Sequence, residues 1–341
     1  MKKILLAAIA IVLLCSHDMF LKFDSYFLEP QSQAVLQLFN GTFDASENSI
    51  DRNRMLDVSL VGNGSRMAQD SSQWFERDLT TYLNFKTGNA GTWVAGVSTA
   101  PRTFNMEAEK FNDYLEHDGV VDMLLSRKRD NKLDQDAIEK YSKHVKTIFQ
   151  VGDKRSDDWT TELGYPIEFV PLKNPYETKT GDLMRVKLLL DSEPLANQMV
   201  LLGNEQPAEQ PHSHGDGAPH THENDGGSDG HTHKGQLELR TDADGVLEFE
   251  INHPGVWHMR TIYMEKKSGD DLTHESNWAT LTFAVDQTSA HDHGANGHSH
   301  DDGTSQSHAT EDHDSEFPSI LFWSVSAVVV IGLFLYFRKK F

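Results

Sequence analysis

A mainly β protein, built from two sandwich-like units with a helical insertion, is the fold class that this sequence predicts. Residues 17–97 read as short apolar stretches with alternating polar residues, separated by Asn/Gly turn signals. Similar stretches resume at 174–286, with tight turns such as TDADG between them. Alternation with period two and turn residues at short intervals are typical of antiparallel sheets and β-sandwich meanders.

The spacing of apolar residues changes between these two regions, at about 106–151. Phe111, Tyr114 and Leu115 recur at helical spacing, and a second set does the same, namely Ile138, Tyr141, Val145, Ile148 and Phe149. This spacing predicts two helices whose apolar stripes face the core. We therefore expect an N-terminal β-rich domain at 17–173 that contains two helices. A second, immunoglobulin-like or transthyretin-like sandwich is expected at 174–286.

The two ends of the chain predict export and membrane anchoring. Residues 1–16 combine two lysines, a short apolar run and Ser16, which is the layout of a signal peptide cleaved before His17. Residues 319–337 form an uncharged apolar run of the length that a transmembrane helix needs, and a basic stub follows at 338–341. The expected location is the inner membrane, with a single span, a periplasmic body and a cytoplasmic C-terminus.

The composition excludes several kinds of site and partner. Cys15 is the only cysteine, so the processed chain contains neither a disulfide nor a thiolate metal site. The formal net charge of −21 argues against nucleic acid and anionic lipid surfaces as partners and favours cations. The sequence contains no GxSxG, HExxH or Gly-rich phosphate loop, and no pair of carboxylates stands out. We expect that the protein is not an enzyme and has no catalytic residues.

Two low-complexity stretches carry the most specific chemical signal. A His-rich loop at 205–234 interrupts the second sandwich, and a His/Asp/Gly-rich linker at 287–315 follows it; neither has the apolar residues to pack a core, so both should be mobile without metal. Five HxH pairs occur in them. Their twelve histidines are His212, His214, His220, His222, His231, His233, His291, His293, His298, His300, His308 and His313.

Neutral imidazole is a common ligand of divalent transition metals, and spacers are seldom made with histidine. We call these two stretches the His tracts and predict that they bind divalent ions. The pattern itself does not choose among nickel, cobalt, zinc and copper. The alternative interpretation is a soluble spacer.

His17 is a second candidate ligand, because a free N-terminal amine and its own imidazole can chelate one ion. The folded part offers three further histidines as candidate ligands: His253, His258 and His274. The alternation in VWHMRTIYM is equally compatible with His258 as a solvent-facing strand residue.

Several segments together resemble a known family. The His17-Asp18 start, EKFNDYLEHDG, LGYPIEFVPLKNPY, GVWHMRTIYM and ESNWATLTFAV are similar, in that order, to a periplasmic family of formally unknown function associated with nickel and cobalt uptake transporters. The resemblance spans roughly 17–285. Met19 before the aromatic Phe20 departs from the usual pattern.

The resemblance implies a component that presents nickel or cobalt to a membrane permease, which is the partner we expect beside the metal ions. Two alternatives stay open: a zinc or copper sequestration or tolerance protein, and a structural or carbohydrate-binding surface protein.

Overall fold

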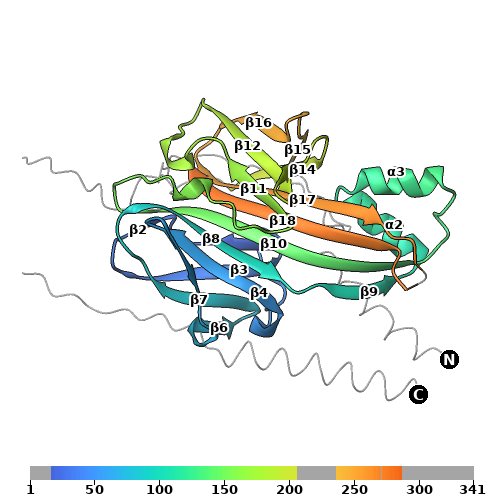
Figure 1. Cartoon of the computed structure of the whole chain (residues 1–341), viewed down its shortest axis with the longest axis horizontal. Coiled ribbons are helices and arrows are strands. Elements are labelled where there is room, and N and C mark those ends of the chain that lie inside the picture. The colour runs from blue at the N-terminus through green and yellow to red at the C-terminus, as the bar shows by residue number, and fades with distance from the viewer. Residues whose placement is uncertain (1–16, 206–235, 270, 286–341) are drawn as a thin grey trace, which may run out of the picture. The chain divides into compact units, whose positions relative to one another are not determined.

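A 15-residue strand, β10 (Ala137–Val151), runs through the middle of the fold (Figure 1). The computed structural model describes residues 17–205, 236–269 and 271–285, which belong to one compact unit. Within these residues β10 pairs in parallel with β18 (His274–Val285), from Glu139 opposite His274 to Thr147 opposite Thr282. The longest strand of the predicted first domain therefore lies beside the last strand of the predicted second domain.

The central sheet contains ten strands. Its order is β15-β14-β17-β18-β10-β8-β4-β5, and β2 and β9 also pair with β10. The remaining bounds are β2 (Phe27–Leu28), β4 (Met55–Gly62), β5 (Ser65–Ala68), β8 (Gly91–Thr99), β9 (Arg102–Met106), β14 (Met199–Glu205), β15 (Leu237–Arg240) and β17 (Gly255–Lys266).

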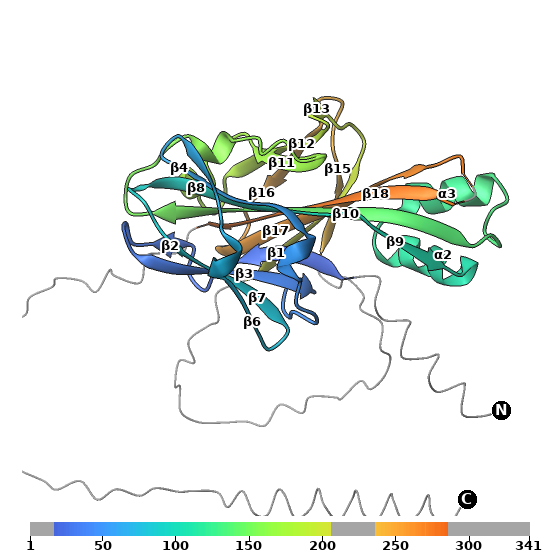
Figure 2. The ribbon, with the colours of Figure 1, turned by 60° about the horizontal axis from the view of Figure 1, so that its bottom comes forward.

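Two smaller sheets cover this central sheet (Figure 2). One has the order β1-β3-β7-β6, with β1 (Asp18–Lys22), β3 (Gln33–Gly41), β6 (Trp74–Arg77) and β7 (Thr80–Lys86). The other pairs β12 (Leu183–Leu190) with β11 (Ile167–Pro171), β13 (Glu193–Pro194) and β16 (Val246–Glu250). The predicted mainly β fold with several sheets is confirmed.

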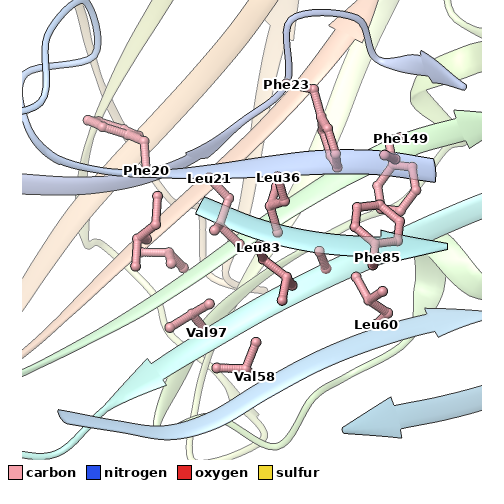
Figure 3. Close-up of a cluster of buried hydrophobic side chains, with 14 of the residues drawn as sticks. Phe20, Leu21, Phe23, Leu36, Val58, Leu60, Leu83, Phe85, Val97 and Phe149 are labelled. Carbon is pink, nitrogen blue, oxygen red and sulfur yellow. The ribbon is translucent and has the colours of Figure 1, made fainter. Parts of the chain in front are cut away.

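The two small sheets pack on opposite faces of the central sheet. Successive side chains of a strand point to opposite sides, so one central strand contributes to both cores. Trp93, Ala95 and Val97 of β8 join the core beneath the β1-β3-β7-β6 sheet, part of which is drawn in Figure 3. Val94, between them, joins the other core, beneath the β12 sheet. Both faces of β8 are buried along its whole length.

A third, smaller core lies where the long strands extend beyond these sheets. Two helices, α2 (Ala108–His117) and α3 (Val121–Arg129), pack there with Phe111 and Leu115 against Ile262 and Trp278. Short 3-10 turns complete the described secondary structure: η1 (Arg52–Arg54), η2 (Ser71–Gln73), η3 (Asp158–Thr160) and η4 (Pro175–Glu177).

One helix of the predicted insertion is confirmed and the other is wrong. The stripe of Phe111, Tyr114 and Leu115 forms the buried face of α2. The stripe from Ile138 to Phe149 belongs to strand β10 instead. From Lys143 to Val151 every β10 residue is buried, so the strand shows no polar alternation and its apolar spacing matched a helix by coincidence. The helical insertion ends at Arg129.

Other predicted segments lie outside the described residues. They are the signal peptide 1–16, nearly all of the His-rich loop 205–234, the linker 287–315, the apolar run 319–337 and the stub 338–341. Among the helices in the part of the chain that the structure describes, none has both the length and the apolar character to cross a membrane. The division into domains at 17–173 and 174–286 stays a prediction.

Candidate metal centre at the start of the first strand

His17 lies at the entrance to β1 and faces one carboxylate. Its Nδ1 is 3.1 Å from Oε2 of Glu47, and the side chains of these two residues are 12% and 36% exposed. The pair therefore lies at the surface, with the imidazole mostly covered and the carboxylate partly open to solvent. Imidazole and carboxylate are both ligands of divalent transition metals.

The loop after β3 brings Glu47 to this position. Asp18, which follows His17, pairs with Gly41 at the end of β3. The backbone N–H of Glu47 then donates to the carbonyl of Asn40 at 3.0 Å, and Thr42 N–H donates to Ala45 O at 3.0 Å. The loop thus folds back over Gly41. A Cβ at Gly41 would lie 2.4 Å from Ala45 O, so the missing side chain allows this close approach.

Buried charges on the central sheet fix the backbone of β1. Lys143 of β10 donates to the His17 carbonyl and, at 3.3 Å, to Asn40 Oδ1. Arg260 of β17 is paired with Asp18 at 3.1 Å, and it also contacts Asp118 after α2 at 3.5 Å. Removing either basic residue would take a positive charge away from these buried acceptors. The start of β1 is therefore held in place by buried side chains of β10 and β17.

The same polar layer continues to Glu139 of β10. Its Oε1 accepts from Ser276 and, at 3.3 Å, from the Tyr114 hydroxyl. Burial raises the pKa of Glu139 to about 7. Around Asp18, Lys143 and Arg260 the side chains leave no room for a water molecule. This layer is structural packing and offers no ligand cavity there.

The three other histidines proposed as ligands are spread over the fold. His253 is exposed, and its carbonyl accepts from Trp257 Nε1. His274 begins β18, where its Nδ1 lies 2.7 Å from Thr273 Oγ1. His258 pairs with Thr282 near the other end of β18, roughly 25 Å away at about 3.3 Å per residue. His258 and His274 therefore cannot bind one ion together.

His258 is buried, which excludes the solvent-facing interpretation. Its ring stacks on Phe43 at 3.8 Å and meets Phe20 edge-on at 5.6 Å. It also lies across Gly203, where a Cβ would come within 2.3 Å of Nε2. Desolvation lowers the pKa of His258 to about 3, with smaller contributions from the positive charges of Lys22 and Arg260. The ring is thus neutral at pH 7.

Two polar residues that the structure makes noteworthy, His144 and Glu47, were not singled out from the sequence. His144 of β10 is buried, with Nδ1 2.9 Å from Ser98 Oγ and Nε2 3.1 Å from Asn277 Oδ1. Both ring nitrogens are engaged, so His144 is an interior polar residue. Glu47 was missed because an acidic residue in a surface loop carries no signal of its own. Only the antiparallel pairing of β1 with β3 places it beside His17.

Within the described ranges, no group of three or more His, Cys, Asp and Glu side chains could hold a metal ion. His17 and Glu47 supply two such side chains. The twelve histidines of the His tracts lie outside the described residues.

The family model for "Domain of unknown function (DUF4198)" matches residues 14–265 of the chain. The expected resemblance to a family of unknown function is thus confirmed over most of the chain. The description of the family says nothing of nickel or cobalt uptake. No curated protein matches the chain.

Solved structures match at low similarity. Escherichia coli alpha-2-macroglobulin activated by porcine elastase shares 8% identity, with 79% of this chain and 20% of that chain covered and a TM-score of 0.19. The D0-D1 domain of intimin shares 11%, with 79% and 98% covered and a TM-score of 0.17. A putative membrane anchored protein from Corynebacterium diphtheriae shares 9%, with 80% and 59% covered and a TM-score of 0.19. TM-scores this low support no statement about fold or function.

Proposed function

This chain belongs to the DUF4198 family, and on that premise we propose that it is a periplasmic, membrane-anchored protein that binds divalent transition-metal ions. It acts without catalysis, as an accessory component of nickel or cobalt uptake beside a membrane permease. The observation that carries the proposal is the repeated HxH pattern of the His tracts. Twelve imidazoles in two short stretches form a high local concentration of ligands that suit divalent transition-metal ions.

The position of the first tract in the fold is compatible with this role. Residues 206–235 connect β14 to β15, which are antiparallel neighbours in the central sheet. Their pairing ends with Leu202 opposite Leu237, and β14 continues to Glu205 paired with β17. Glu205 at one root makes an ion pair with Lys22 at 3.2 Å. Long insertions between paired strands cost little stability, so a ligand-rich segment can be carried there without disturbing the core.

The charge of the chain favours cations as the cargo. A net charge of −21 creates a negative field that raises the local concentration of divalent ions. Aspartates and glutamates among the tract histidines add oxygen ligands, for example Asp216, Glu223 and Asp292. We propose that the tracts act as a loose reservoir from which a permease is supplied.

Growth of a deletion strain at varied metal concentration tests the uptake role. Uptake predicts a defect when nickel or cobalt is scarce, and repair of that defect by added metal. Sensitivity only when zinc or copper is in excess would instead support sequestration or tolerance. Unchanged growth under both conditions, together with unchanged surface adhesion after loss of both tracts, would support the structural or carbohydrate-binding alternative.

A further inference from the structure

We propose that Glu47 is the third ligand of a metal site formed with the N-terminal amine and Nδ1 of His17. The inference rests on the proposed function and on cleavage of the leader before His17. It assigns one specific, tight site for a divalent first-row transition-metal ion to the folded body, separate from the His tracts.

The chemistry of the first residue selects Nδ1. When a terminal amine and its own imidazole bind one ion, the amine and Nδ1 close a six-membered ring that includes the metal, whereas Nε2 is too far from the amine. In the structure Nδ1 is the nitrogen that faces Glu47. The nitrogen that can join the chelate ring is therefore the one that lies beside the carboxylate.

The distance between the two ligand atoms fits coordination. Metal bonds to imidazole nitrogen and carboxylate oxygen are about 2.0–2.2 Å long, so two ligands at a right angle are separated by about 3.0 Å. Nδ1 and Oε2 are 3.1 Å apart. The separation that the structure shows is thus short enough for one ion, lying to one side of the line between the two atoms, to bind both. Amine, imidazole and carboxylate together suit the tetragonal N,O geometry of nickel and copper.

Both ligands are held by the fold before the ion arrives. The His17 carbonyl is bound by Lys143, and the next residue, Asp18, is paired with Arg260. Glu47 is fixed by its backbone bond to Asn40, in the loop that closes over Gly41. A preorganised pair loses less side-chain entropy on binding than free residues do, which favours a tight site. The part-exposed Glu47 carboxylate leaves the ion a path from solvent.

The test uses the full chain, exported and processed by its host, with all twelve tract histidines replaced by serine. Mass spectrometry first establishes that it begins at His17. Calorimetric titration with nickel chloride, and electron paramagnetic resonance with copper, should then reveal one bound ion. Glu47→Gln should weaken its Kd at least tenfold and change the copper spectrum. Asp44→Asn, which removes the same charge from an exposed position of the same loop, should leave both unchanged.

One alanine inserted before His17 should weaken the site as strongly as Glu47→Gln, because the amine leaves the chelate ring. Thermal unfolding without metal checks that Glu47→Gln is folded. Equal affinity of Glu47→Gln and the parent, a chain that does not begin at His17, or no single ion would each overturn the inference. A different comparison tests the proposed function. That function would be contradicted if the chain with intact tracts bound no more ions than the serine variant.

Discussion

The imidazole of His258 lies flat on the ring of Phe43, with centroids 3.8 Å apart and planes inclined by 14°. The imidazole also lies against the backbone of β14 at Gly203, where any side chain would collide with it. A buried histidine, an aromatic ring and a glycine from three separate strands or loops thus meet near the root of the first His tract.

Replacing Gly203 with alanine should destabilise the fold. The added Cβ would lie 2.3 Å from His258 Nε2, and the buried ring cannot move aside because Phe43 and Phe20 enclose it. We expect a loss of about 1–3 kcal/mol in the free energy of unfolding, measured by urea denaturation. Gly269→Ala is the matched control, because its nearest neighbour would be 3.6 Å away, and it should change stability by less than about 0.5 kcal/mol. Equal effects of the two would contradict the stacking argument.

His258 should contribute to acid destabilisation. Its pKa is about 3 in the fold and about 6.5 when unfolded, so the unfolded chain binds the proton first. The stabilising contribution is complete above pH 6.5 and is lost as the pH falls toward 3. His258→Phe should therefore lose less stability than the parent between pH 7 and pH 4.5, by on the order of 2 kcal/mol, in urea denaturation at both values. The exposed His253→Gln should behave as the parent does.

Glu139 should affect stability in the opposite pH range. Its pKa rises from 4.5 to about 7 in the fold, because burial disfavours the ionised carboxylate. Ionisation of Glu139 therefore lowers the free energy of unfolding. This loss is absent below pH 4.5 and complete above pH 7. Glu139→Gln keeps an acceptor for Ser276 and Tyr114 and removes the charge. It should stabilise the protein by about 3 kcal/mol at pH 8.5 and have little effect at pH 4.5. A stability gain that does not depend on pH would contradict this explanation.

Lys146 and Glu168 form a buried ion pair. Removing one partner alone should destabilise the fold far more than replacing both. Their 2.9 Å contact lies in the core, and Glu168 also accepts from the N–H groups of Leu163 and Gly164. Lys146→Met should cost about 3–5 kcal/mol because it leaves a buried carboxylate without its cation. Adding Glu168→Gln should recover much of that loss. A double-mutant cycle by urea denaturation measures the coupling, and additive losses would show that the charges act independently.

Metal binding by the intact chain should depend on pH through the tract histidines. Unperturbed imidazole has a pKa of about 6.5 and must be deprotonated to bind a metal ion. Calorimetric titration with nickel should show several bound ions near pH 7.5 and far fewer near pH 5. Replacing the twelve tract histidines by serine should remove most of the bound ions at pH 7.5. An unchanged count would exclude the His tracts as the main ligands.

The sequence by itself determined the mainly β class, the buried face of α2 and the candidate ligands of the His tracts. These depend on local properties, namely alternation, turn residues, helical spacing and the repeated use of histidine. The tertiary structure alone decided that the stripe from Ile138 to Phe149 is a strand, since burial on both faces erases the period by which strands are recognised. It also decided that His258 is buried under Phe43 and that Glu47 faces His17. Such contacts are set by strand register, which joins residues far apart in the chain.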